Sequence, residues 1–277
     1  MNLSAATAHA NTALQGVSDT PQLDASILLC HVLDCPRSFL LSHPETLLTP
    51  AQQQMFEALV GRRAQGEPVA YLTGVKAFWS LELKVTPDVL IPRSETETLV
   101  EAALARLAPD KPLRIADLGT GCGAIALALA RKRPSTHVVG TDVSDAALSV
   151  ARDNARLHGV ANVVFVDGTW FDALEGQQFD LILSNPPYVA VGDPHLAALR
   201  YEPQAALVAG PDGLQALRTL IGKAPAYLMP EGWLLLEHGA EQGDAVRGLF
   251  SAAGFSAVET LPDLAGLPRV SLGAMKK

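Results

Sequence analysis

The tetrapeptide Asn185-Pro186-Pro187-Tyr188 has residue types that could orient a planar amide or amine, and it follows the apolar run Phe179–Ser184. Each proline fixes its own backbone and drives the preceding residue towards an extended conformation, so the segment is stiff. The Asn185 side-chain oxygen and the Pro186 carbonyl are two acceptors for one NH2 group, and Tyr188 could pack on the flat face of that group. The pattern predicts a site that aims a nitrogen lone pair; a rigid loop at a strand end is the alternative.

A second segment, residues 117–123, predicts a turn that binds a nucleoside cofactor. Gly119, Gly121 and Gly123 alternate with Thr120 and Cys122 after an apolar run, and glycine lets a backbone turn tightly and approach a ligand. A dinucleotide-binding turn has the spacing G-x-G-x-x-G, with space for a pyrophosphate at the helix start. Here the third glycine comes one position early and an acid precedes the turn. This spacing favours a ligand that has no phosphates and carries a positive charge.

Two further side chains extend the predicted cofactor site. Asp142 ends the next expected strand, within about 20 residues of the glycine turn, where an acid accepts hydrogen bonds from ribose hydroxyls. A helix cap is the alternative role of Asp142, but Ser144 or Asp145 could supply that cap. Trp170 follows the third strand, where its indole could form a wall for adenine or belong to the core.

The two segments together predict direct in-line methyl transfer to a nitrogen that is a poor nucleophile. An amide lone pair is delocalised, so attack on a sulfonium methyl builds positive charge on the nitrogen. Both hydrogen bonds donated by that nitrogen then strengthen, which stabilises the transition state specifically. In-line alignment could contribute roughly 7–11 kcal/mol. No strong base is required, because the nitrogen of the product becomes acidic.

Composition restricts the alternatives. The chain has 277 residues, 48% hydrophobic and 18% charged, so it can fill a core and is not disordered. Its net charge of −8 argues against a protein that binds along a nucleic-acid backbone. Three cysteines are too few for a disulfide framework, and the seven histidines show no metal-ligand spacing, so no metal is expected. We expect a cytoplasmic protein, since no membrane span or secretory signal is evident.

The chain is predicted to have three parts: a helical domain at 1–73, a hairpin linker at 74–92 and a catalytic domain at 93–277. Thr20-Pro21 and Thr49-Pro50 predict helix starts, with threonine as the cap and proline in the first turn. Residues 75–91 partly alternate apolar and polar side chains, which indicates a hairpin with its turn at Pro87-Asp88.

From residue 113 onwards, strands and helices are expected to alternate. Buried apolar strands separated by single helices predict an α/β fold with a parallel sheet covered on both faces and a ligand crevice at the carboxyl ends of the strands. Strands are expected at 113–118, 137–142, 162–167, 179–184, 233–238 and 256–260, and helices at 124–132, 145–158, 214–228 and 242–253.

The chain resembles the protein-(glutamine-N(5)) methyltransferases of peptide chain release factors, the PrmC or HemK family. The resemblance covers essentially the whole chain. Residues 67–74 and 201–203 are its most specific parts, whereas the glycine turn and Asn-Pro-Pro-Tyr occur in many methyltransferases. The remaining blocks are residues 89–93, 235–239 and 263–266. One departure is Ser94, where the family commonly has proline after the arginine.

The resemblance implies a Rossmann-like class I methyltransferase with a small helical amino-terminal domain, in a bacterial cytoplasm. It implies S-adenosyl-L-methionine as the cofactor and the glutamine of the Gly-Gly-Gln loop of class I release factors as the substrate. It further implies that the amino-terminal domain docks the release factor. The implied cofactor contacts are Gly119, Thr120, Gly121, Cys122, Gly123, Asp142, Trp170 and Asn185, and the implied substrate contacts are Asn185, Pro186, Pro187 and Tyr188, of which Asn185, Pro186 and Tyr188 are catalytic.

Two other classes of function are weighed against this one. An adenine-amine DNA methyltransferase also uses an Asn/Asp-Pro-Pro-Tyr loop, but it must flip its base and hold the nucleic-acid backbone, and no basic region for that is evident. A non-catalytic scaffold on a nucleoside-binding fold is the third class. Asn185 and Asp142, both intact, argue against the scaffold.

Overall fold

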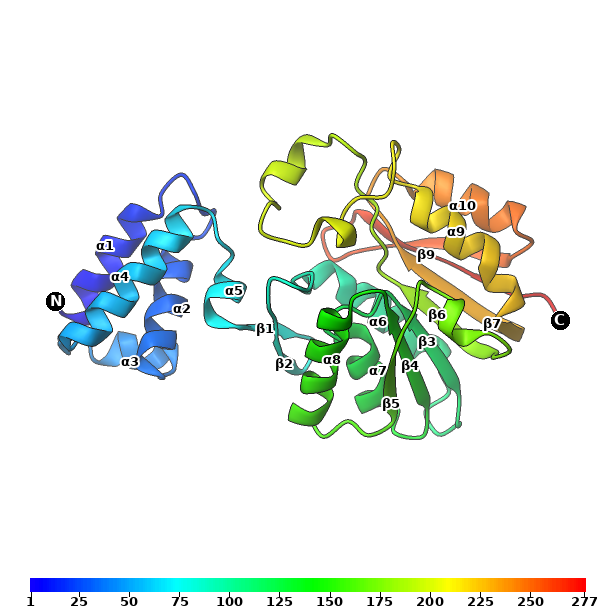
Figure 1. Cartoon of the computed structure of the whole chain (residues 1–277), viewed down its shortest axis with the longest axis horizontal. Helices are drawn as coiled ribbons and strands as arrows, with labels where there is room; N and C mark the ends of the chain where they lie inside the picture. Colours follow the sequence, from blue (N-terminus) through cyan, green and yellow to red (C-terminus); the bar gives the residue numbers. More distant parts are fainter. The chain divides into compact units, whose positions relative to one another are not determined.

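The computed structural model describes all 277 residues, which form two compact units, Met1–Val75 and Lys76–Lys277. Figure 1 shows that the first unit is helical and that the second contains the large sheet. None of the helices combines the length and the apolar character that crossing a membrane requires.

Unit 1 is a small helical domain with its own core. Apolar side chains from four of its helices pack together with Leu14, which follows the first helix, and Leu48. The helices are α1 (Leu3–Ala13), α2 (Pro21–Leu33), α3 (Arg37–Ser42), α4 (Pro50–Ala64) and α5 (Val69–Thr73).

The two predicted helix starts are correct, but only one of the two threonines caps its helix. Thr49 accepts from the Gln52 backbone N–H while the Gln52 side chain accepts from the Thr49 N–H, which is a capping box. Thr20 makes no capping bond, and its hydroxyl lies 3.5 Å from Asp24 instead. The prediction of a Thr20 cap is therefore wrong, because a buried carboxylate one turn later is the partner of the hydroxyl.

Asp24 joins two helices of unit 1 by a buried ion pair. Its carboxylate is 2.8 Å from Nε of Arg63 on α4 and accepts from the Ser18 hydroxyl at 2.7 Å. The Asp24 and Arg63 side chains are only 10% and 15% exposed, so little solvent screens the pair. Removing one partner of a buried pair leaves the other charge without compensation.

We expect Asp24→Ala to destabilise unit 1 by about 3–5 kcal/mol, because the Arg63 guanidinium would lose its buried partner. Urea unfolding followed by circular dichroism measures this change. Asp19→Ala is the matched control, since it removes the same charge from an exposed position just before α2. Equal stability of the two variants would contradict the structural role of Asp24.

Unit 2 begins with a two-stranded hairpin of β1 (Val75–Phe78) and β2 (Leu81–Lys84). Its turn is at Trp79-Ser80, and Trp79 has a φ of 54°. Pro87-Asp88 forms a separate turn beyond the second strand, so the predicted position of the hairpin turn is wrong. Alternation alone did not indicate the tighter turn, because Trp79 is not a residue typical of the left-handed region.

The main sheet has seven strands in the order β5-β4-β3-β6-β7-β9-β8. The α/β fold class is confirmed, since the first five of these strands run parallel. Helices α6, α7 and α8 lie on one side of the sheet and α9 and α10 on the other (Figure 1). The strands are β3 (Arg114–Leu118), β4 (His137–Asp142), β5 (Val163–Asp167), β6 (Phe179–Ser184), β7 (Leu228–Glu237), β8 (Ser256–Pro262) and β9 (Pro268–Ala274), and the helices are α6 (Glu97–Arg106), α7 (Ala124–Lys132), α8 (Asp145–Leu157), α9 (Gln215–Lys223) and α10 (Gly243–Ala252).

The expectation of a purely parallel sheet is wrong at one edge. Strand β9 was not predicted, and it pairs antiparallel with both β7 and β8. Only residues 263–267 separate β8 from β9, and a parallel crossover requires a dozen residues or more. Helix α6 was also missed. The expected helix 214–228 ends at Lys223 and β7 begins at Leu228, five residues before the predicted start at 233, whereas the other predicted elements of unit 2 occur close to their expected bounds.

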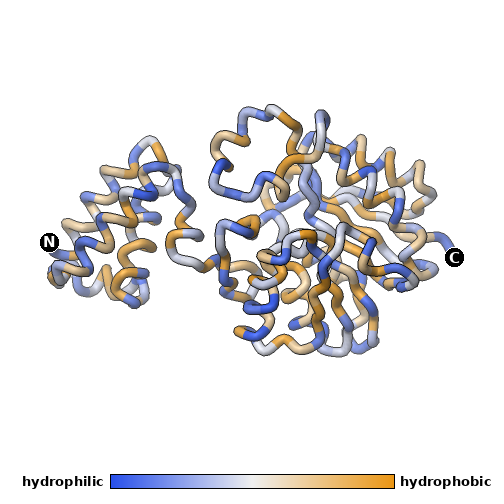
Figure 2. The backbone as a smooth tube through the Cα atoms, in the orientation of Figure 1, coloured by the Kyte–Doolittle hydropathy of each residue, from blue (hydrophilic) through white to orange (hydrophobic).

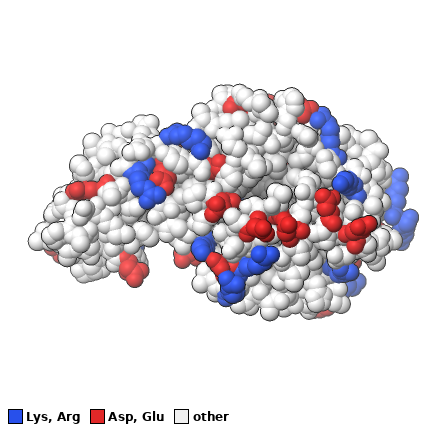
Figure 3. Space-filling model, in the orientation of Figure 1, with Lys and Arg blue, Asp and Glu red and all other residues white.

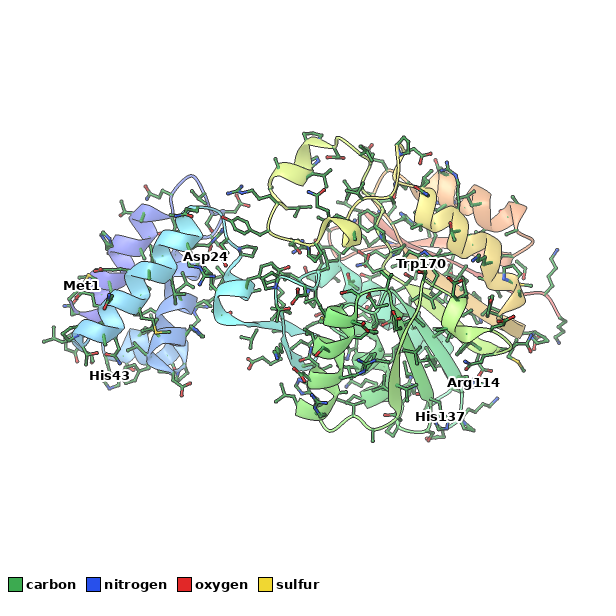
Figure 4. All side chains as sticks on the ribbon, viewed as in Figure 1. Met1, Asp24, His43, Arg114, His137 and Trp170 are labelled. Atoms are coloured by element: carbon green, nitrogen blue, oxygen red, sulfur yellow. The ribbon has the colours of Figure 1, made fainter.

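Buried apolar side chains of the sheet hold the carboxyl ends of the strands in place. Figure 2 shows hydrophobic residues gathered along the strands. Leu118, Ile182 and Leu236 on three adjacent strands are fully buried in one cluster with residues of α9 and α10. Trp170 lies at the carboxyl edge of the sheet, and Arg114 and His137, the first residues of β3 and β4, lie at the opposite edge (Figure 4).

Candidate active site

The site lies where strand order reverses in the sheet of unit 2. Strand β3 is flanked by β4 on one side and by β6 on the other, so the loops after these strands diverge and leave a crevice. This crevice opens into a cavity of about 270 Å³. The lining residues are Asp88, Val89, Leu90, Gly119, Gly121, Asp142, Val143, Ser144, Ala147, Gly168, Thr169, Trp170, Asn185, Pro187, Pro203, Ala205 and Ala206.

The glycine turn forms the floor of the cavity. Gly119, Gly121 and Gly123 have φ values of +74°, +55° and +85°. Residues that carry a side chain rarely adopt this backbone conformation. A Cβ atom at Gly119 would come within 3.2 Å of the Trp170 ring, so the indole packs directly on the bare backbone. The turn therefore needs glycine both for its conformation and for the close approach of Trp170.

Asp142 braces the glycine turn from the neighbouring strand. Its Oδ2 accepts from the Gly121 N–H at 2.9 Å and its Oδ1 from the Ser144 N–H at 3.0 Å. Ser144 caps helix α8 by accepting from the Ala147 N–H at 3.2 Å, so the prediction that Asp142 is not needed as the cap is confirmed. Each carboxylate oxygen has a second lone pair, which leaves acceptor capacity towards the cavity.

Trp170 is held in a conformation that is unusual for its residue type. Its φ is 57°, and the Thr141 hydroxyl donates to its carbonyl at 3.0 Å. A non-glycine residue in this region costs about 1–3 kcal/mol and persists only where its surroundings fix it. The cost is consistent with a functional position of the indole in the cavity wall.

Three residues of the glycine turn that were expected to contact the cofactor do not line the cavity. The Thr120 hydroxyl donates to the buried Asp117 carboxylate at 2.7 Å, and burial raises the pKa of Asp117 to about 7. Cys122 is buried, and burial raises the pKa of its thiol to about 12, so it is an inert residue of the turn. A Cβ atom at Gly123 would meet Leu127, Phe165 and Ala151 within 3.3 Å.

The Asn185 side chain has a defined orientation at the end of β6. Its Nδ2 donates to the Thr96 hydroxyl at 3.0 Å, so its Oδ1 remains available as an acceptor. Pro186 is buried and Pro187 lies in the cavity wall. The peptide bonds of both prolines are trans.

Tyr188 is tied to a buried acid at the end of β7. Its hydroxyl donates to Oε1 of Glu237 at 3.4 Å, and its carbonyl accepts from the Gln242 side chain at 3.1 Å. Burial raises the pKa of Tyr188 above its usual range, so the phenol stays neutral and acts as a donor. Burial also raises the pKa of Glu237, to about 7.

Two wall segments of the cavity were not among the predicted site residues. Residues 88–90 form one of them and Pro203, Ala205 and Ala206 the other. Glu202, which is 5% exposed, joins them by accepting from the Ile91 N–H at 3.1 Å and pairing with Arg93. The only signal in the sequence was the resemblance of the blocks that contain Arg93 and Glu202.

Comparison with known proteins identifies the family. Residues 5–74 match the PrmC N-terminal domain and residues 96–201 the methyltransferase small domain. The release factor glutamine methyltransferase of Xylella fastidiosa (strain Temecula1) is 54% identical over 254 residues, which are 91% of this chain and 92% of the relative. The chain belongs to the release factor glutamine methyltransferase family. The resemblance found in the sequence is thereby confirmed.

Further relatives agree with this membership. The release factor glutamine methyltransferase of Escherichia coli K12 is 50% identical over 258 residues, 92% of this chain and 93% of the relative. A crystal structure of a methyltransferase from Pyrococcus furiosus has a TM-score of 0.55 at 20% identity, and the match covers 78% of this chain and 98% of that chain, which shows the shared fold. The chain is a methyltransferase, and its cofactor is S-adenosyl-L-methionine.

The residues of the cavity fit this cofactor. Gly119 and Gly121 line the cavity with backbone alone, so neither has a side chain that limits the approach of a ligand. Asp142 offers a carboxylate for hydroxyl donors, and the Trp170 indole offers a flat wall for a base.

We expect Glu202→Gln to weaken S-adenosylmethionine binding several-fold, because the two wall segments would lose the ion pair that joins them. Loss of a charged hydrogen bond costs about 1.5–3 kcal/mol. Isothermal titration calorimetry measures the affinity. Glu259→Gln is the control, because it removes the charge from the pair with Arg106, which is outside the cavity. Unchanged affinity in Glu202→Gln would show that the pairing of Glu202 with Arg93 does not support the cavity.

Proposed function

We propose that this chain methylates the side-chain amide nitrogen of the glutamine in the Gly-Gly-Gln motif of class I peptide chain release factors, in the cytoplasm. The observation that carries the proposal is the orientation of Asn185 beside the cofactor cavity. Its amide group donates to Thr96, so its oxygen is the atom available to an acceptor NH2 group. The names of the relatives support a release factor as the protein substrate.

The chain's own residues would activate the amide by accepting from it. Asn185 Oδ1 and the Pro186 carbonyl would each take one hydrogen bond from the substrate NH2, which directs the nitrogen lone pair. Both bonds strengthen as positive charge develops on the nitrogen. Tyr188, held by Glu237, would pack on the face of the amide. S-adenosylmethionine supplies an electrophilic methyl group on a sulfonium when it is bound.

The cofactor would be held by residues from three strand ends. We assign Asp142 to the ribose hydroxyls, Trp170 to adenine and the bare backbone of Gly119 and Gly121 to close contact. All four residues line one cavity, and Asn185 lines it as well. The acceptor residue thus adjoins the cofactor site.

We further propose residues 1–73 as the domain that docks the release factor, 74–92 as a linker and 93–277 as the catalytic domain. The match of residues 5–74 to the PrmC N-terminal domain supports a role specific to this family, because the methyltransferase small domain match begins only at residue 96.

Asn185→Ala should lower the rate of methylation at least about a hundredfold, because one of two acceptors for the developing charge would be lost. Transfer of label from S-adenosylmethionine to purified release factor measures the rate. The midpoint of thermal unfolding is the control and should change little, since Asn185 lies at a strand end. Near-normal turnover would refute the acceptor role.

Asp142→Ala should weaken cofactor affinity roughly ten- to a hundredfold, since a hydrogen bond to a charged group is worth about 1.5–3 kcal/mol. The Gly121 turn would also lose its brace. Calorimetric titration with S-adenosylmethionine tests this prediction. If the dissociation constant of S-adenosylmethionine were unaltered in Asp142→Ala, Asp142 would not bind the ribose hydroxyls.

The substrate is tested with parallel acceptors: release factor, release factor whose Gly-Gly-Gln glutamine is replaced, and unmethylated duplex DNA. We expect label on the first only. The net charge of −8 and the row of acidic side chains across one face of unit 2 (Figure 3) do not favour DNA. Label on DNA alone would establish the adenine reaction instead, and label on no acceptor would overturn the proposal.

A further inference from the structure

The side chain of Gln242 bridges two parts of unit 2: the acceptor segment, residues 185–188, and the turn that follows β7. Its Nε2 donates to the Tyr188 carbonyl oxygen at 3.1 Å, and its Oε1 accepts from the Gly239 N–H at 2.9 Å. Gln242 stands at the N-cap position of α10 but its side chain makes no capping bond there. Both ends of this amide are therefore used to join the acceptor segment to the turn.

The acceptor segment depends on this bond because its two prolines have no N–H to donate. The next residue along the chain, Val189, is held by backbone bonds on both sides. Its N–H donates to the Leu207 carbonyl at 2.9 Å, and its carbonyl accepts from the Ala209 N–H at 2.9 Å. The Tyr188 carbonyl lies between the stiff prolines and this anchored residue, and its hydrogen-bond donor is a side chain.

Two glycines pack closely around the bridge. A Cβ atom at Gly213 would lie 2.3 Å from the Tyr188 carbonyl oxygen and 2.8 Å from Nε2 of Gln242. A Cβ atom at Gly239 would lie 3.3 Å from Oε1 of Gln242 and 3.7 Å from Cδ2 of the Tyr188 ring. A side chain at position 213 would therefore have to displace the Tyr188 carbonyl or the Gln242 amide.

We propose that Gln242 is a positioning residue for the methyl transfer: by holding the Tyr188 carbonyl it fixes the acceptor segment. This inference rests on the proposed function of residues 185–188. Gln242 does not line the cofactor cavity, so it acts on the acceptor amide only through Tyr188.

The stiffness of the segment explains how a bond at Tyr188 affects the acceptors that precede it. Proline fixes its own φ, so two consecutive prolines absorb little of a displacement that begins at Tyr188. The Pro186 carbonyl and the Tyr188 ring would then move together. Misplacement of a reacting group by about 1 Å can lower a rate by roughly a hundredfold, so a small shift of the segment is sufficient.

Gln242→Glu isolates the bond to Tyr188. It keeps the length of the side chain and an oxygen for the Gly239 N–H, but it replaces the donor by an oxygen that repels the Tyr188 carbonyl. We expect kcat with release factor to fall roughly ten- to a hundredfold. The affinity for S-adenosylmethionine should not change, because Gln242 lies outside the cavity. Gln178→Glu is the matched control, since it makes the same change at an exposed position just before β6, and it should keep kcat.

Gly213→Ala disturbs the same bond from the opposite partner. Its added Cβ atom would clash with the Tyr188 carbonyl, so the loss of kcat should resemble that of Gln242→Glu. Gly254→Ala is the control for backbone strain. Gly254 has a φ of +87°, close to the +70° of Gly213, but a Cβ atom there would meet no atom within 4 Å. Its kcat should match that of the parent chain.

A measurement without any acceptor separates this inference from the proposed function. Tyr188-Val189 is the only place in the sequence where valine follows tyrosine. Protein labelled with carbon-13 at the tyrosine carbonyl and nitrogen-15 in valine therefore gives one correlation peak, which reports on the Tyr188 carbonyl. We expect this peak to move in Gln242→Glu and Gly213→Ala and to stay in place in the two controls.

Three results would overturn the inference. The first is a peak that does not move in either variant, because Gln242 would then not hold the carbonyl. The second is a peak that moves while kcat stays at the parent value. The third is a loss of S-adenosylmethionine affinity as large as the loss of kcat, which indicates general disruption. If the parent chain methylated no release factor, the proposed function would fail, and the peak would still decide whether Gln242 holds Tyr188.

Discussion

The hydrogen bond from the Asn185 amide to the Thr96 hydroxyl is the interaction on which the acceptor site depends. It decides that an oxygen, and not an NH2 group, is presented beside the cofactor cavity. Thr96 stands just before α6, so the packing of this helix against β6 determines the orientation of one side chain. A primary amide is a weak nucleophile, and in the proposed reaction it is activated by fixed acceptors and not by a strong base.

The cofactor half of the site depends on a second constraint, the bare backbone of the glycine turn. Gly119 allows the Trp170 ring to approach, and Asp142 holds the turn at Gly121. The reversal of strand order at β3 brings this turn and the Asn185 segment to adjoining positions. The wall segments joined by Glu202 complete a cavity whose floor and acceptor end come from different strands.

Local patterns in the sequence were sufficient for the elements that carry the motifs. Strands β4 and β6 and helix α7 have the predicted bounds, because apolar runs there end at clear breakers. Helix α6 and strand β9 were missed. Strand β9 follows a short turn, whereas the alternation of strands and helices in the sequence predicted a helix between successive strands. Thr96, Glu237 and the wall segments could not be assigned from local pattern, since their roles depend on contacts across 49 to 111 positions of the chain. Thr120 and Cys122 belong to the motif but face inward, which spacing does not reveal.

A crystal structure of the chain with S-adenosylhomocysteine and a peptide that contains Gly-Gly-Gln would test the proposed acceptor role of Asn185 most directly. We predict that the glutamine side-chain nitrogen lies within hydrogen-bonding distance of both Asn185 Oδ1 and the Pro186 carbonyl, with the Asn185 amide group still donating to Thr96. A glutamine nitrogen bound elsewhere, or an Asn185 amide rotated so that its NH2 faces the peptide, would contradict the central claim.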